Sequence, residues 1–205
     1  MDNIISKKTN EAYQFKITLT GSKPSIWRRI LVLSNYSFWD LHVAIQDSMG
    51  WLDYHLHSFS VTDPTTNSEV EIGIPDEEYD SFDRKVLADH KVKISKYFNE
   101  NNRNARYEYD FGDSWIHTIK FEKIIQAAVG EKYPKCIDGR MACPPEDCGG
   151  IYGYYNLLSI LRDPKNEEYN GMIEWVGGGF DAESFDPQAV SFDDPKERLK
   201  RMNEG

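Results

Sequence analysis

Five stretches of the chain have a strand pattern, and in all of them except 26–33, which is mostly apolar, apolar and polar residues alternate. This period of two is typical of strands with one buried face, because successive side chains of a strand point to opposite sides. The stretches are residues 13–20, 26–33, 55–61, 105–111 and 115–123. The turn residues GSKPS separate the first two stretches and FGDS separates the last two, which predicts two hairpins.

A period of three to four residues predicts helices at 37–49 and 152–162. Ser37 is a typical capping residue before the first helix, Gly50 ends it, and Pro164 follows the second. Further helical patterns are weaker and shorter. They cover residues 94–98, residues 169–176 before three glycines, and a capped run from Asp194.

The order of these elements predicts an α+β fold, with one domain, a mostly antiparallel sheet and helices packed on one face. The expected domain covers residues 13–192, between an extended or disordered N-terminal segment at 1–12 and a C-terminal helical tail at 193–205. The acidic stretch 62–85 predicts a long mobile loop. The side chains expected in the core include Trp27, Phe38, Ile45, Phe59, Tyr109, Trp115, Ile119 and Leu158.

The net charge and the lack of long apolar runs limit the classes of function that we expect for this chain. The chain has 205 residues and a net charge of −10, which argues against strong non-specific binding of nucleic acid, because Lys and Arg supply most of that affinity. It has no apolar run of the roughly 20 residues that cross a bilayer, and its first residues lack a signal-peptide pattern. We therefore expect a soluble, cytoplasmic protein, with Arg28 and Arg29 as candidates for a local contact with DNA.

Three cysteines, Cys136, Cys143 and Cys148, lie in the Pro- and Gly-rich segment CIDGRMACPPEDCGG. Thiolates in this arrangement could bind structural zinc. Two of them could form a disulfide, although the cytosol keeps thiols reduced. The third alternative is that the thiols act as small buried apolar groups.

Three histidines share their expected strand faces with apolar residues, His55 and His57 with Phe59, and His117 with Trp115. A buried imidazole needs a partner for its nitrogens, either a metal ion or a group such as a backbone carbonyl. We predict that the three thiols lie close together and bind zinc, with His57 or His117 as the fourth ligand. The spacing C-x6-C-x4-C differs from the C-x2-C of common zinc sites, so packing of the thiols stays the alternative.

Four carboxylates, those of Asp110, Asp113, Glu146 and Asp147, lie beside turn residues. Asp is common in turns because it accepts hydrogen bonds there, and the helix dipole favours Asp and Glu near a helix start. Their presence at these positions therefore does not require a catalytic role. A metal-assisted hydrolase would require at least two of them and an imidazole to converge in an open cleft. Because no nucleophile or phosphate-loop motif is present, we predict a non-enzymatic binding domain, with the metal-assisted hydrolase as the alternative.

Five segments, in this order, resemble one known family. They are IWRRILV, FWDLHVAIQDSMGW, HLHSF, YEYDFGDSWIHTI and CIDGRMACPPEDCGGIYGY. The similarity is to the plasmid pRiA4b ORF-3-like family and extends from about Tyr13 to Phe192. The resemblance implies a single α+β domain associated with mobile genetic elements. It adds a further alternative, an accessory protein that binds a protein partner or a specific DNA site.

Overall fold

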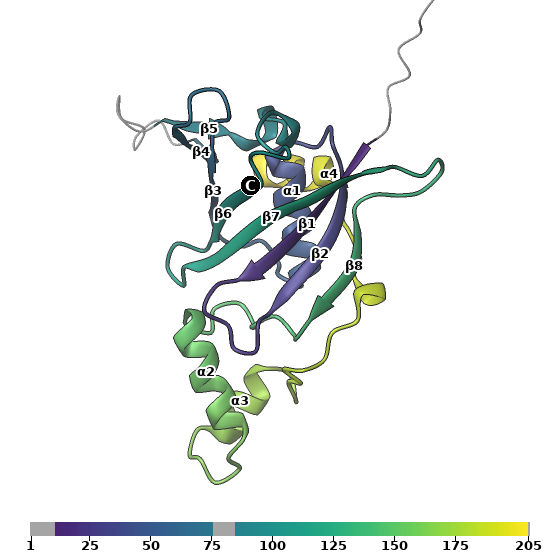
Figure 1. The fold of residues 1–205 in the computed structure, drawn as a ribbon. Helices are drawn as coiled ribbons and strands as arrows, with labels where there is room; N and C mark the ends of the chain where they lie inside the picture. The colour runs from purple at the N-terminus through teal and green to yellow at the C-terminus, as the bar shows by residue number, and fades with distance from the viewer. Residues whose placement is uncertain (1–10, 76–84, 205) are drawn as a thin grey trace, which may run out of the picture.

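The computed structural model describes residues 11–75 and 85–204. Its centre is one eight-stranded sheet with the order β5-β4-β3-β6-β7-β1-β2-β8 (Figure 1). The strands are β1 Glu11–Leu19, β2 Trp27–Leu33, β3 His57–Thr62, β4 Glu69–Gly73, β5 Val86–Ala88, β6 Asn104–Tyr109, β7 Trp115–Gln126 and β8 Lys135–Arg140. Neighbouring strands are antiparallel except β4 and β5, which are parallel. The predicted fold class is confirmed.

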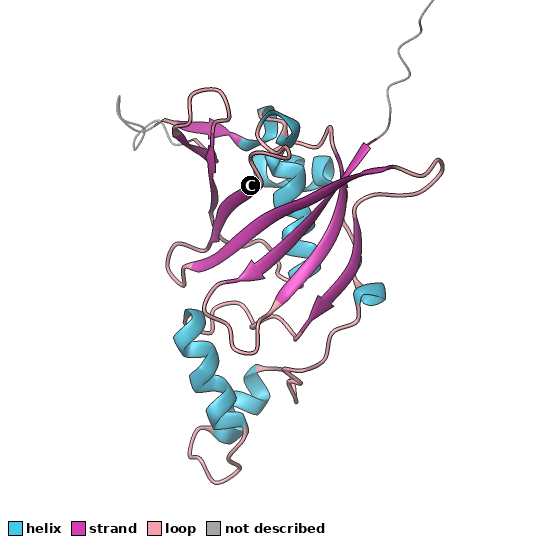
Figure 2. Ribbon diagram, viewed as in Figure 1, coloured by secondary structure: helices cyan, strands magenta, loops and turns pink. Residues whose placement is uncertain are grey.

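The helices complete a single α+β domain (Figure 2). They are α1 Phe38–Met49, α2 Gly150–Leu161, α3 Tyr169–Trp175 and α4 Pro195–Glu204, with short 3-10 turns η1 Asp89–Lys91, η2 Ile94–Lys96 and η3 Pro187–Ala189. Among the described residues, no helix is both long and apolar enough to cross a membrane.

The first helix, α1, covers one face of the sheet. Its ends follow the sequence prediction: the Ser37 hydroxyl accepts from Asp40 N, the Asp40 carboxylate accepts from Ser37 N, and Gly50 ends the helix with φ 88°. Most of its residues are buried because β2, η1 and α4 pack around it. In contrast, α2 and α3 pack on each other beyond the strand ends (Figure 1).

The sequence did not predict the strands β4, β5 and β8. Strand β4 lies inside the stretch 62–85 that was expected to be a loop, and β8 contains Cys136, which was expected in a loop with the other thiols. The edge strands β5 and β8 show little alternation of apolar and polar residues. Residues 69–72 of β4 do alternate, but the run is short and lies among acidic and turn residues. Residues 1–10 and 76–84, parts of the segments predicted to be extended or mobile, lie outside the described residues.

Strand β2 places an arginine in the core. Residues Ile26, Arg28 and Ile30 are buried, whereas Trp27, predicted in the core, lies on the opposite face and is only partly buried. Leu158 of α2 was also predicted in the core and is partly buried, because α2 lies beyond the sheet. The alternation of side chains along β2 therefore places Arg28 in the core and Trp27 on the other face of the sheet.

Neither of the two adjacent arginines is free to contact a phosphate. Arg28 donates from Nε to Ser48 O at 2.8 Å and from Nη1 to Trp27 O and Arg140 O at 2.9 and 3.1 Å. Arg29 is at the surface but forms ion pairs with Glu122 at 2.8 Å and Asp138 at 2.6 Å. The geometry does not support a DNA contact through this pair.

Candidate functional site

The three predicted zinc-binding thiols are free and lie in different environments. Cys143 is buried, Cys136 sits in β8, and Cys148 precedes α2. Burial raises the pKa of Cys148 to about 12, and it raises the pKa of the other two thiols as well. Without a metal ion the three sulfurs are therefore protonated at neutral pH.

The two histidines predicted to join these thiols are buried but have other neighbours. His57 Nε2 lies 3.0 Å from Asp89 Oδ2, and His117 Nδ1 lies 3.0 Å from Trp115 O. All five predicted ligands belong to the described residues, and no three of them bring ligand atoms within 4.8 Å of one another. The zinc site stays a prediction that would require these groups to move together.

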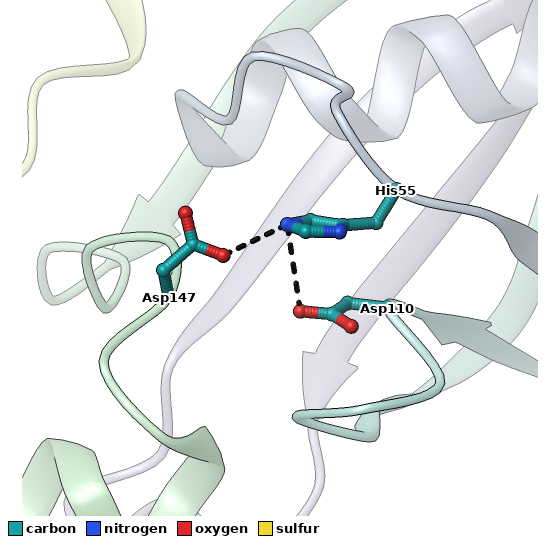
Figure 3. Close-up of side chains that lie close together, drawn as sticks. All are labelled: His55, Asp110 and Asp147. Carbon is teal, nitrogen blue, oxygen red and sulfur yellow. Dashed lines mark hydrogen bonds and ion pairs between the residues drawn. The ribbon is translucent and has the colours of Figure 1, made fainter.

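A different set of residues comes together where three loops meet at the end of the sheet. His55 Nε2 lies 2.8 Å from Asp147 Oδ1 and 3.7 Å from Asp110 Oδ2 (Figure 3). Ligand atoms of the three residues lie within 4.8 Å of one another, the single such group of His, Cys, Asp or Glu in the described part of the chain. Ligands held at roughly 2.1 Å from one ion are about 3.0–3.4 Å apart, so a cation would replace the 2.8 Å hydrogen bond between His55 and Asp147 and draw Asp110 closer to His55.

Turn geometry and hydrogen bonds hold the two loops that carry Asp110 and Asp147. Asp110 and Asp147 have left-handed φ values of 57° and 59°, a conformation that Asp adopts in turns more readily than most non-glycine residues. Oδ1 of Asp110 also accepts from two backbone N–H groups of the following turn. Asp113, in the same turn, accepts from Gly149 N at 3.0 Å and so joins the β6–β7 turn to the loop that carries Asp147.

A further set of hydrogen bonds supports the site through Glu146. Its Oε1 accepts from the Tyr109 hydroxyl at 2.5 Å and its Oε2 accepts from Leu52 N at 2.7 Å. The Tyr109 oxygen in turn accepts from Tyr54 N at 3.0 Å. Burial and the Glu146 carboxylate raise the pKa of Tyr109, so its hydroxyl stays protonated and donates. Glu146 therefore fastens the segment before His55 to the strand β6.

The electrostatics of the cluster favour a positive charge. Partial burial lowers the pKa of His55, but the carboxylates of Asp147 and Asp110 outweigh this effect and raise it above its ordinary value. His55 is one-third exposed and Asp147 mostly exposed, so solvent reaches the site. The arrangement therefore attracts a cation, either the proton on His55 or a metal ion in its place.

Two hollows flank the cluster. A groove of about 840 Å³ has His55 in its wall and α4 on its far side. A smaller hollow of about 290 Å³ lies between α2 and α3 and has Asp147 in its wall. The cluster thus lies between two concave surfaces, as is common for binding sites.

The sequence pointed to the three residues separately but not to the set. Asp110 and Asp147 were two of the four candidate carboxylates, and both lie in turns rich in Gly or Pro. His55 was expected on the buried face of a strand, which is wrong, because β3 begins only at His57. The segment before β3 is instead held by its bonds to Glu146 and Tyr109. His42, which is fully buried, was missed altogether.

Known proteins resemble this chain over most of its length. The model of the plasmid pRiA4b ORF-3-like protein family matches residues 11–189. An uncharacterised protein of Sinorhizobium fredii is 34% identical over 179 residues, which cover 87% of this chain and 86% of that protein. The crystal structure of a protein of unknown function from Methanosarcina mazei Go1 has a TM-score of 0.83 and 42% identity, and the match covers 90% of this chain and all of that one.

Proposed function

We propose a cation-dependent hydrolytic function for this chain, which belongs to the plasmid pRiA4b ORF-3-like protein family. His55, Asp110 and Asp147 would bind one divalent cation, and the flanking groove would hold the substrate. The observation that carries the proposal is the convergence of two carboxylates and an imidazole, from three separate loops, beside an open groove. This is the arrangement that a metal-assisted hydrolase requires.

The composition of the site favours catalysis over a purely structural role for the ion. Three protein ligands leave coordination positions for water, as in catalytic zinc sites, whereas structural zinc sites use four protein ligands. A Zn²⁺ ion held by these residues would lower the pKa of a bound water and so supply a nucleophile near neutral pH. The nitrogen and two carboxylate oxygens suit Zn²⁺ or Mn²⁺.

The supporting residues have positioning roles. Glu146 is not part of the group whose ligand atoms converge, and its two oxygens accept from the Tyr109 hydroxyl and Leu52 N, so we assign it the role of orienting the loops. Asp113 likewise holds Gly149 and keeps the turn carrying Asp110 next to the loop carrying Asp147. Hydrogen bonds that orient the ligands in this way strengthen a metal site.

The first experiment measures Mn²⁺ and Zn²⁺ binding by isothermal titration calorimetry, with electron paramagnetic resonance for Mn²⁺. We expect one site per chain, and at least tenfold weaker binding in His55→Ala and Asp147→Asn. Asp138→Asn is the matched control, because it removes an exposed carboxylate paired with Arg29, away from the cluster. Equal affinities in all four proteins would contradict the proposal.

The second experiment measures turnover. The purified protein is incubated with chromogenic ester, amide and phosphodiester substrates, with Mn²⁺ or with a chelator. We expect cation-dependent hydrolysis that is lost in His55→Ala. Cation binding without hydrolysis of any substrate would favour the non-enzymatic binding domain.

A further inference from the structure

Apolar side chains are exposed on both sides of the His55–Asp110–Asp147 cluster. In the groove these are Leu52, Tyr54, Leu56, Ile74 and Met202, whose exposed fractions run from 36% to 71%. In the smaller hollow Leu157 and Met172 lie beside Trp175, which is 48% exposed. Apolar groups gathered in a concave surface indicate a binding site, whereas single exposed ones do not.

The charged groups of the groove are largely paired with one another. Arg198 lies 2.6 Å from Asp47, 2.8 Å from Asp193 and 3.7 Å from Asp53. Arg201, the other arginine of the groove, lies 3.3 Å from Asp193. Three carboxylates of the groove, those of Asp47, Asp53 and Asp193, thus face its two arginines, and the chain has a net charge of −10. A phosphate or carboxylate ligand would meet repulsion here.

We infer that the substrate is a peptide with apolar side chains on both sides of the bond that faces the cluster. One side chain would occupy the groove beside His55 and another the hollow beside Asp147. The inference rests on the proposed function and names its substrate class. The His55–Asp110–Asp147 cluster lies between the two apolar surfaces. A peptide matches this order because a polar backbone joins its apolar side chains.

Other occupants match the surface less well. A continuous hydrocarbon chain would have to cross the carboxylates of Asp110 and Asp147 and desolvate them without offering a hydrogen bond. A nucleic acid would bring phosphates to a surface whose arginines are already paired. A peptide amide offers a carbonyl oxygen to a cation at the cluster and side chains to both hollows.

The reaction would add water across the amide bond. The water oxygen forms a bond to the carbonyl carbon, the carbon–nitrogen bond breaks, and one proton of the water passes to the leaving nitrogen. Neither oxidation nor reduction takes place, so no further reactant is needed.

The test is fluorescence anisotropy with an end-blocked, fluorescein-labelled hexapeptide of Leu, Phe and Ala. The comparison ligands are the same peptide with Glu in place of Leu and Phe, a fluorescent fatty acid, and a labelled deoxythymidine hexamer. We expect the apolar peptide to bind at least tenfold more tightly than each of them. Tighter binding of any comparison ligand would overturn the inference.

Substitutions in each apolar surface test whether the peptide contacts both of them. Trp175→Ala and Met202→Ala, one in each hollow, should each weaken peptide binding at least fivefold and leave Mn²⁺ affinity unchanged. Tyr152→Ala is the matched control, because Tyr152 is 87% exposed and lies in neither hollow. If only one of the two variants weakens binding, the peptide does not span the cluster and the inference fails.

The same measurements separate this inference from the proposed function. Mn²⁺ binding without preference for the apolar peptide would overturn the peptide inference alone. Peptide binding to both hollows without Mn²⁺ binding would overturn the cation-dependent function and support a peptide-binding surface.

Discussion

The imidazole rings of His42 and His57 lie face to face in the core, with their centroids 3.5 Å apart and 9° between their planes. His42 Nε2 lies 2.8 Å from Asp53 Oδ1, and His57 Nε2 lies 3.0 Å from Asp89 Oδ2. Burial, helped by the neighbouring His57, lowers the pKa of His42 to about 4 despite Asp53. The protein therefore keeps His42 neutral at pH 7.

We predict that the fold loses stability between pH 7 and pH 5. Burial lowers the pKa of His117 to about 3, against 6.5 for an ordinary histidine. Below pH 6.5 the unfolded chain therefore binds a proton that the folded chain excludes. The contribution of neutral His117 to the free energy of unfolding is complete above pH 6.5 and is lost as the pH falls toward 3. At pH 5 the loss from His117 is about 2 kcal/mol, and His42 adds to it in the same direction.

Urea unfolding at pH 7, 6 and 5 measures this effect. His117→Phe removes one titrating group, so its stability should depend less on pH than that of the parent protein. A parent protein equally stable at pH 7 and pH 5 would contradict the assignment of buried neutral imidazoles.

Substitution of Arg28 should be far more destabilising than substitution of Arg29. Arg28→Ala leaves the carbonyls of Ser48, Trp27 and Arg140 without their donor and opens a cavity, so we expect a loss of about 3 kcal/mol or more. Arg29→Ala removes surface ion pairs and should lose less than about 1 kcal/mol. Urea unfolding of the two variants compares them directly, and similar losses would show that Arg28 is not a core residue.

Gly150→Ala should disturb the cation site. A Cβ atom at this position would lie 2.4 Å from Asp113 O, and φ is +65°. Gly130 has a φ of +83°, and a Cβ atom there would meet no atom within 4 Å, so Gly130→Ala carries only the left-handed strain of about 1 kcal/mol. We expect Gly150→Ala to lower the melting temperature more than Gly130→Ala and to weaken Mn²⁺ binding. Unchanged Mn²⁺ affinity would show that the contact with Asp113 does not position the ligands.

Tyr109→Phe should weaken cation binding without removing a ligand. The variant loses the hydroxyl that donates to Glu146 and accepts from Tyr54 N, and loss of such supporting bonds lowers metal affinity roughly tenfold. Tyr36→Phe is the matched control, because its hydroxyl donates to Tyr133 O, which belongs to none of the three site loops. Mn²⁺ titration compares the two variants. An equal change in both would show that Tyr109 acts on stability alone.

Local patterns determined the central strands and the first helix. The alternation from Tyr13 to Leu19 reports which side chains of β1 face the core, because a strand has a period of two. Ser37 and Gly50 fix the ends of α1 through hydrogen bonds and backbone angles within one turn of the helix. Such signals depend on neighbouring residues only, and the sequence contains them in full.

The edges of the sheet and the site depended on tertiary structure. Strands β5 and β8 carry little alternation of their own and form because a neighbouring strand supplies hydrogen-bond partners. Residues 69–72 of β4 do alternate, but the run is short and lies in an acidic stretch that predicts a loop. His55 and Asp147 are 92 positions apart along the chain. The sequence shows that both residues can bind a cation. Residues so far apart meet only through the register of the sheet and the packing of its loops, so the tertiary structure alone brings them within hydrogen-bonding distance.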